Sequence, residues 1–538
     1  MESNILAFTG QSYLLLQGAS VQQVVVALAI LATTITVFMS MLAPKQRYAD
    51  APIACFDAGD PVKSLAAARE RFRTDAIGML QEGYTRYKGK PWYVPSPLGE
   101  RLMLPKQYVE EIRTAPVEDV DFVATFYEMF EGKYTTMGSR STLHPRVSRN
   151  ELNQNMGSVL EPVQEEIREA FLVNLPETED WQKVDLHTCI VQIVARVSSR
   201  MFGGTDLAHS EDWVRSTIDF ATDGFIGAQA IKQYPHALRP LAAKFIPAIV
   251  NIKKHLEIAD RVIVPVLEAR RAAEAAGWPE TGGEAPSDFL QWMLGAAAGK
   301  EQDNSYIALI QLKLSFAAIH TSAAAPTQLL YDICAMPEWA DILREEIDQV
   351  KRAAGGEITD KQTLAKLDKL DSFMKESQRF NPLLLITFER LITRDWTFSD
   401  GFKVPANTQI GVPTQAISMD PSIYPEPDKF DGLRFYNLKE ALKRGSGDGK
   451  ADVGEIGKLA FTSSNHESMA FGYGRHACPG RWFAGNEIKM ITVYLLEHYE
   501  FRFPGNKTGW ENRPRSIGVE TQYLPNHHAV VEMRRRRV

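Results

Sequence analysis

The sequence predicts a mainly α fold with a minor β part, preceded by a single N-terminal transmembrane helix. Helical patterns fill residues 105–380, strand-and-turn patterns follow Pro382, and an unbroken apolar run occupies residues 24–43. With 44% hydrophobic and 24% charged residues, the 538-residue chain has the composition of an ordinary globular protein. The formal net charge of -7 gives no electrostatic basis for nucleic-acid binding.

The N-terminal segment has the length and composition of a membrane anchor. Residues 3–44 carry no charged side chain, and residues 24–43 are long enough to cross a hydrocarbon core of about 30 Å. Lys45 and Arg47 follow directly, so the positive-inside rule places the body in the cytosol. A cleaved signal peptide, the alternative, would have a basic start and a shorter apolar stretch. The predicted parts are a short lumenal N-terminus (1–23), the transmembrane anchor (24–43), a tether (44–60) and one catalytic domain (61–538).

The body begins with a helix and a hairpin. Residues 64–89 are amphipathic and predict a helix, and residues 90–105 predict a β-hairpin with a Pro-Leu-Gly turn. A long, almost wholly helical region follows up to residue 380, without repeats of 20–50 residues. A second hairpin is expected over residues 397–413.

The four cysteines are far apart in the sequence and form no C-x-x-C pair. This spacing argues against structural zinc and against a disulfide scaffold. Cys55, Cys189 and Cys334 are expected to be buried thiols, as free cysteines usually are. Cys478 differs because of its neighbours.

Cys478 lies in the stretch FGYGRHACPG, residues 471–480. Gly472 and Gly474 permit a tight turn, and Gly480 leaves room for a flat macrocycle. A helix is expected to follow, and its free N–H groups stabilise a thiolate. A thiolate ligated to haem iron favours cleavage of the O–O bond.

This stretch resembles the haem-binding motif F-x-x-G-x-[RH]-x-C-x-G of the cytochrome P450 family. The resemblance implies a cytochrome P450-like helical fold, haem b (iron protoporphyrin IX) and Cys478 as the axial ligand of the iron. It assigns His476 and Arg390 to the haem propionates. The third partner usually stands in a W-x-x-x-R motif, but here the segment reads LHPRVSRNEL without tryptophan. Arg149 is the choice there, with a plain surface arginine as the alternative.

Two further motifs occur in the order that the family expects. Glu376 and Arg379 form an E-x-x-R, which places opposite charges on one helix face. Downstream, Arg434 in FDGLRF matches the arginine that closes a three-way network with that pair. By resemblance, the network holds the cysteine loop and does no chemistry.

A third motif lies in the centre of a long helical run. The residues Ala317-Ala318-Ile319-His320-Thr321-Ser322 resemble the family pattern [AG]-G-x-[DE]-T-[TS] over the distal face of the haem. Thr321 matches the threonine that helps to pass protons to bound oxygen. His320 replaces the usual acid. Either its imidazole relays protons or the side chain only packs against a neighbouring helix.

The resemblance implies a membrane-anchored haem-thiolate monooxygenase that oxidises a lipophilic small molecule by hydroxylation, epoxidation or multistep oxidation. Electrons would come from NADPH through a separate NADPH-cytochrome P450 reductase, with cytochrome b5 as a further donor, because the chain shows no flavin or nicotinamide motif. The anchor implies contact with membrane lipid and a single-pass endoplasmic reticulum location with a cytosolic catalytic domain.

The stretches FAAIHTS and GRHACPGRWFA resemble fungal members of secondary metabolism, in particular ent-kaurene oxidase-like enzymes. A terpenoid, alkaloid or polyketide substrate follows from that resemblance. We expect substrate selection to depend on residues 105–130, 215–245 and 386–388. Two alternatives stay open: a haem-thiolate isomerase or dehydratase that works without dioxygen, and a non-enzymatic membrane protein that binds haem or another ligand.

Overall fold

The computed structural model divides the chain into two compact units, Met1–Tyr48 and Ala49–Val538. Nearly all of the predicted anchor, residues 24–43, lies outside the described residues; the few described between 22 and 34 are helical. Cys55 also lies outside them. The structure describes residues 20, 22–23, 25–26, 29–30, 34, 48–54, 64–97, 99–138, 140–278, 285–358, 360–445 and 452–537.

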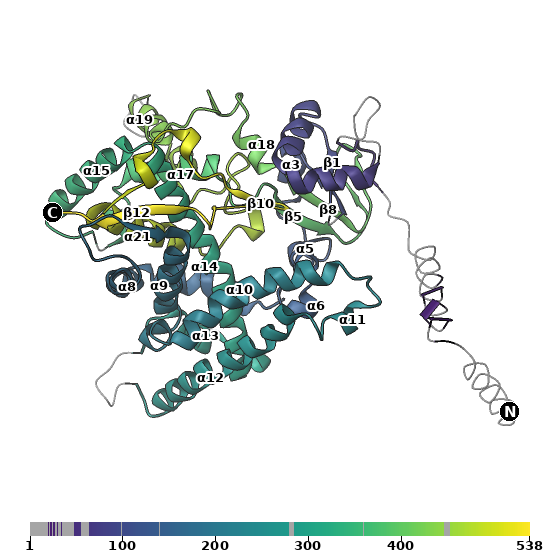
Figure 1. Ribbon diagram of the computed structural model, residues 1–538, viewed down its shortest axis with the longest axis horizontal. Helices are drawn as coiled ribbons and strands as arrows, with labels where there is room; N and C mark the ends of the chain where they lie inside the picture. The colour runs from purple at the N-terminus through teal and green to yellow at the C-terminus, as the bar shows by residue number, and fades with distance from the viewer. Residues whose placement is uncertain are drawn as a thin grey trace. The chain divides into compact units, whose positions relative to one another are not determined.

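The second unit is built mainly from helices (Figure 1). The predicted first helix is α3 (Leu65–Arg86), and it begins where the hydroxyl of Ser64 accepts a hydrogen bond from the amide of Ala67. The other helical segments are α4 (Lys106–Ile112), α5 (Phe122–Met129), α6 (Gly132–Thr135), α7 (Leu143–Val147), η1 (Ser148–Leu152), α8 (Met156–Asn174), α9 (Leu186–Ala208), α10 (Glu211–Lys232), α11 (Arg239–Ala242), α12 (Pro247–Ala275), α13 (Phe289–Ala296), η2 (Gly299–Gln302), α14 (Asn304–Ala335), α15 (Glu338–Ala354), α16 (Lys361–Leu364), α17 (Asp368–Phe380), α18 (Thr414–Ser418), α19 (Arg434–Gly445), α20 (Val453–Lys458), η3 (Gly474–His476), α21 (Arg481–His498), η4 (Pro504–Asn506) and η5 (Trp510–Asn512).

The strands form one larger sheet and three small ones among the described residues. The larger sheet has the order β1-β2-β8-β5-β3, with β1 and β2 as the predicted first hairpin. The second predicted hairpin forms over β6 and β7 only, because β8 pairs with β2 and β5 instead. The strands are β1 (Trp92–Ser96), β2 (Gly99–Met103), β3 (Val120–Asp121), β4 (Gln182–Asp185), β5 (Thr387–Ile392), β6 (Trp396–Thr397), β7 (Lys403–Val404), β8 (Thr408–Val412), β9 (Tyr499–Arg502), β10 (Ile517–Val519), β11 (Gln522–Leu524) and β12 (Val530–Arg535).

The second unit starts earlier than the predicted domain boundary at residue 61. Ala49 donates its amide to the hydroxyl of Tyr93 at 2.9 Å, and Ile53 forms a bridge with Tyr93 in β1. Residues 49–54 of the expected tether thus pack on the first strand of the sheet.

Helix α14 runs through the middle of the helical part and contacts α9, α10, α12, α17 and α21 (Figure 1). By length and composition it is the one helix in the described part of the chain that could cross a membrane. More than half of its most apolar window (56%) is buried inside the protein, as expected for a core helix. Helix α14 therefore contributes many of its side chains to the core of the second unit.

Candidate functional site

The loop before α21 holds Cys478 in a conformation that needs glycine. Gly472 and Gly474 have φ angles of +72° and +71°, in the left-handed region. A Cβ on Gly474 would lie 2.6 Å from the carbonyl oxygen of Arg113, so a larger residue would clash. The amide of Cys478 donates to the carbonyl of Phe471 at 2.8 Å and closes the loop.

The thiol of Cys478 points at the start of α21. Burial raises its pKa, but the amides of Gly480 and Arg481 and the charge of Arg481 act in the opposite direction. These groups favour the thiolate because their partial and full positive charges lie close to the sulfur. The sequence-based expectation of a helix N-terminus behind the sulfur is met by α21, which begins at Arg481.

The space next to Gly480 is open enough for a flat group to lie against the backbone. Its φ of -90° is open to any residue, and a Cβ there would meet no atom of the described residues within 4 Å. Neither the backbone conformation nor a neighbouring atom of the described part of the chain therefore requires glycine at this position. Close approach of a bound group to the backbone is the remaining steric reason for it.

Positive charges gather beside the cysteine loop. The pKa of His476 falls to about 4, first because of burial and then because of the charges of Arg390, Arg149 and Arg475. Burial also lowers the pKa of Arg390 to about 10. Arg149 donates to the carbonyl of Arg475 at 3.2 Å, so it lies next to the loop despite the missing tryptophan. This excess of positive charge suits a ligand that carries carboxylates.

Helix α5 connects the cysteine loop with α14. The ring of Phe122 stacks on His476 with 5.4 Å between the ring centroids, and the guanidinium of Arg390 lies over the same ring. One turn further on, Phe126 meets Phe316 of α14 at 6.3 Å. The loop and the centre of α14 thus border the same short helix.

The centre of α14 carries the two residues predicted to handle protons. Thr321 is exposed, as is Ala317 one turn earlier, although most of this helix is buried. The hydroxyl of Thr321 donates to the carbonyl of Ala317 at 2.8 Å. His320 points elsewhere: its Nε2 lies 3.3 Å from the carbonyl oxygen of Ile218 in α10, and burial lowers its pKa. This position favours packing over the relay of protons.

Glu376, Arg379 and Arg434 lie together in the interior. The carboxylate of Glu376 is fully buried and accepts two hydrogen bonds from Arg379 at 2.8 and 2.9 Å. It accepts two more from Nε of Arg434 at 3.1 and 3.2 Å. Further bonds run from Arg379 to the carbonyls of Ser418 and Pro427 and tie α17 to the segment before α19.

Lys375 connects α17 with the segment that supports the cysteine loop. Its ammonium donates to the carbonyls of Lys458 and Ala460 at 2.8 and 2.9 Å. Phe461, the next residue, packs edge-on against Phe471 at the start of the loop. The sequence analysis did not single out Lys375. The one feature of the sequence that could have indicated its role is its position next to Glu376.

Glu487 is a second residue that the sequence reasoning missed. It lies on α21, two turns after Gly480, and is 1% exposed. Burial raises its pKa to about 7, although hydrogen bonds with Ser198 and Ser322 favour the charged form. Because Ser322 follows Thr321, a carboxyl that titrates near neutrality lies directly behind the centre of α14.

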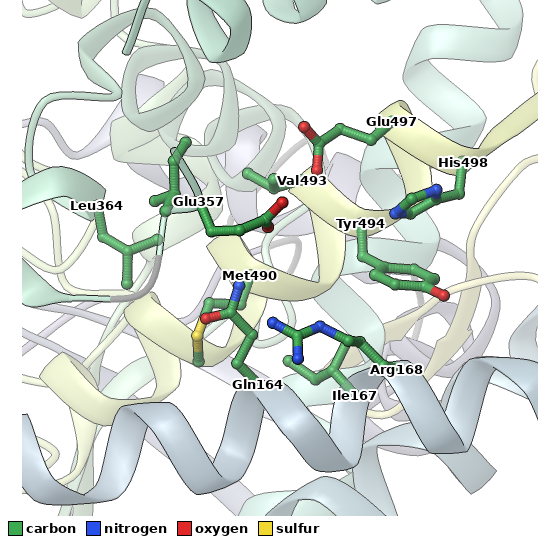
Figure 2. A pocket seen from close by; sticks show the side chains of 11 residues that line it. Gln164, Ile167, Arg168, Glu357, Leu364, Met490, Val493, Tyr494, Glu497 and His498 are labelled. Atoms are coloured by element: carbon green, nitrogen blue, oxygen red, sulfur yellow. The ribbon is translucent and has the colours of Figure 1, made fainter. Parts of the chain in front are cut away.

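Figure 2 shows a cavity of about 410 Å³ between α8 and the C-terminal half of α21. Gln164, Arg168 and Glu497 are among the residues that line it, and none of the predicted site residues does. It is a separate feature from the cysteine loop.

Residues 115–526 match the cytochrome P450 family. Cytochrome P450 monooxygenase AN1598 of Emericella nidulans is 35% identical over 469 residues, which cover 87% of this chain and 84% of the relative. Ent-kaurene oxidase P450-4 of Gibberella fujikuroi is 32% identical over 475 residues, covering 87% and 89% of the two chains. The chain belongs to the cytochrome P450 family.

The family implies a haem held by a cysteine thiolate, and the residues of this chain fit such a group. The thiol of Cys478 lies at a helix N-terminus. Gly480 leaves space beside the loop that no described side chain fills, and a cluster of cations is available for the propionates. The protein is an oxidoreductase of the cytochrome P450 monooxygenase class.

Proposed function

We propose that this protein is a membrane-anchored haem-thiolate monooxygenase that inserts one oxygen atom from dioxygen into a lipophilic small molecule. The observation that carries the proposal is the pairing of the Cys478 loop with the Thr321 face of α14, both bordering α5. Bound haem b supplies the activation of dioxygen and the oxidation of the substrate.

The chain's own residues hold the haem and manage protons in this proposal. Cys478 would hold the haem iron through its thiolate, whose charge is stabilised by the amides at the start of α21. His476, Arg390 and Arg149 bind the propionates, and Gly472 and Gly480 shape the loop. Thr321 holds a proton on its hydroxyl at the exposed part of α14.

Electrons come from NADPH through a separate reductase, with cytochrome b5 as a further donor. The relatives named ent-kaurene oxidase support a fungal secondary metabolite as substrate, with a terpenoid, alkaloid or polyketide skeleton. The apolar run at residues 24–43 supports a single-pass anchor in the endoplasmic reticulum with a cytosolic body.

An apolar surface around α10, α11 and the start of α12 supports membrane contact. Leu241 and Phe245 are 59% and 75% exposed, and Ile226, Tyr234 and Leu238 are exposed nearby. Large exposed apolar groups on one surface suit lipid better than water. Fractionation of cells after alkaline extraction, with the full chain and a chain lacking residues 1–43, tests the location: the full chain should stay with the membrane.

The test of the function is the carbon monoxide difference spectrum of the reduced full-length protein, beside Cys478→Ser. A strongly red-shifted Soret band that disappears in the variant is the expected result. A haem-free protein, or a band unchanged by the substitution, would contradict the proposal. Turnover that needs neither reductase nor dioxygen would instead favour the isomerase or dehydratase alternative.

A further inference from the structure

The exposed side of α14 extends one turn beyond Ala317 to a lysine. Lys313, Ala317 and Thr321 are spaced four residues apart, so they follow one another along the same side of the helix. Lys313 is half-buried there, and the next turn carries Phe316, whose ring packs against Phe126 of α5. A charged side chain thus stands at the edge of the face that contains Thr321.

The ammonium of Lys313 has no hydrogen bond or ion pair with any residue that the structure describes. Burial lowers its pKa, and no carboxylate acts to raise it. Other inward-facing lysines differ: Lys232 donates to the carbonyl of Met129 at 2.6 Å, and Lys489 pairs with Asp371 at 2.7 Å. An unpaired cation that is half-buried has lost part of its hydration, so an anionic partner from outside the chain would be well bound.

A histidine stands close to this lysine. The pKa of His144 in α7 falls to about 4, first because of burial and then because of the charge of Lys313. Its Nδ1 is buried and has no hydrogen-bond partner among the described residues. Two polar groups from different helices therefore influence each other electrostatically, and neither has a hydrogen-bond partner among the described residues.

The haem propionates have other cations. The positive charges that shift the pKa of His476 are those of Arg390, Arg149 and Arg475, and Lys313 is not among them. Lys313 instead belongs to the α14 face with Ala317 and Thr321.

We propose that Lys313, with His144 beside it, binds a carboxylate of the substrate, so that the enzyme takes lipophilic acids rather than neutral hydrocarbons. This inference rests on the proposed monooxygenase function. A partly desolvated ammonium binds a carboxylate through a charge-assisted hydrogen bond. A neutral analogue leaves the same ammonium unpaired, which makes such a site selective against it.

The test measures the binding of acids and their methyl esters to the haem-loaded, full-length protein. The probes are dodecanoic acid and abietic acid with their methyl esters, followed by the Soret spin-state shift and by calorimetry. Wild type should bind at least one acid about tenfold or more tightly than its ester. Lys313→Met should abolish this preference, and Lys313→Arg should keep most of it.

Lys253→Met, on the exposed side of α12, is the matched control and should leave the preference unchanged. Two results would overturn the inference: no acid preferred over its ester by wild type, or a preference that survives in Lys313→Met. Loss of bound haem in Lys313→Met would also overturn it, because the lysine would then serve a propionate. If the carbon monoxide spectrum denies thiolate ligation, the proposed function fails, whereas the calorimetric acid preference still decides the role of Lys313.

Discussion

The Glu376 network and the exposed face of α14 differ in how far their polar groups are hydrogen-bonded or paired with opposite charges. Around Glu376 the buried carboxylate meets two arginines, whose remaining donors reach backbone carbonyls. On α14, Lys313 has no hydrogen-bond or ion-pair partner among the described residues, and there the hydroxyl of Thr321 bonds only to carbonyls of its own helix. The first region therefore stabilises the fold, whereas the polar groups of the second are open to a ligand.

The largest effect is expected from breaking the satisfied region. Glu376→Ala leaves Arg379 and Arg434 buried without their anion, which should cost about 3–5 kcal/mol in the free energy of unfolding. Urea denaturation measures this loss, and haem content should fall with it. Glu440→Ala, at an exposed i,i+3 pair with Lys443, is the control and should have little effect. A Glu376→Ala protein as stable as wild type would show that the network does not hold the fold.

The second prediction concerns Glu487, which is buried like Glu376 but has no cation. With its pKa raised to about 7, the folded state keeps a proton that the unfolded state releases near pH 4.5. Stability from this group is present below pH 4.5 and is lost as the pH rises to about 7. Glu487→Gln removes the titration, so its unfolding free energy relative to wild type should rise by about 3 kcal/mol across that window.

The measurement is the difference in unfolding free energy between Glu487→Gln and wild type at each pH. The difference is needed because Glu346 and Asp332 also have raised pKa values and titrate in both proteins. A difference that is flat from pH 4.5 to 7 would contradict the raised pKa of Glu487.

The helices and hairpins that depend on local pattern could be predicted from the sequence. The amphipathic run at 64–89 became α3, and the hairpin at 90–105 became β1 and β2. The partner of β8 could not be predicted, since its parallel pairing with β2 joins residues about 300 positions apart. The packing of Ala49–Ala54 on β1 could not be predicted either, because it joins segments about 40 positions apart that share no local pattern.

In the candidate site, too, features fixed by local sequence could be predicted and features that depend on tertiary packing could not. The loop around Cys478 could be predicted because glycines and a helix start fix its conformation locally. Lys313 and Glu487 could not, since an ordinary charged residue becomes unusual only when neighbouring helices remove it from water without an opposite charge beside it. The sequence-based substrate regions, 105–130, 215–245 and 386–388, do not include Lys313.

The third prediction sharpens the comparison within α14 itself. Thr321 and Thr327 both donate to the carbonyl four residues earlier at 2.8 Å, but Thr321 is exposed and Thr327 is fully buried. Thr321→Ala should lower product formed per NADPH by about tenfold while NADPH consumption continues, because proton delivery is impaired. Thr327→Ala should leave this ratio unchanged. Equal ratios in the two variants would remove Thr321 from proton handling.

The smallest effect is expected at His320, the neighbour of Thr321. Its Nε2 lies 3.3 Å from the carbonyl of Ile218, and burial keeps the imidazole neutral because it lowers the pKa. His320→Gln can still donate to that carbonyl, so we expect product per NADPH within about twofold of wild type and a stability loss of about 1 kcal/mol or less. Assays over pH 5–8 measure both.

The pH dependence separates packing from proton relay at His320. Burial disfavours the imidazolium of His320 in the folded state. The contribution of His320 to the free energy of unfolding is therefore fully present above the unfolded pKa of about 6.5, and it is lost as the pH falls below that value. Glutamine does not titrate, so the variant should lose the share of acid sensitivity that comes from His320, measured as its difference from wild type, without losing coupling; His144 and His476 keep theirs. If His320→Gln instead uncouples product formation as strongly as Thr321→Ala, the imidazole relays protons, and its bond to Ile218 is only its resting position.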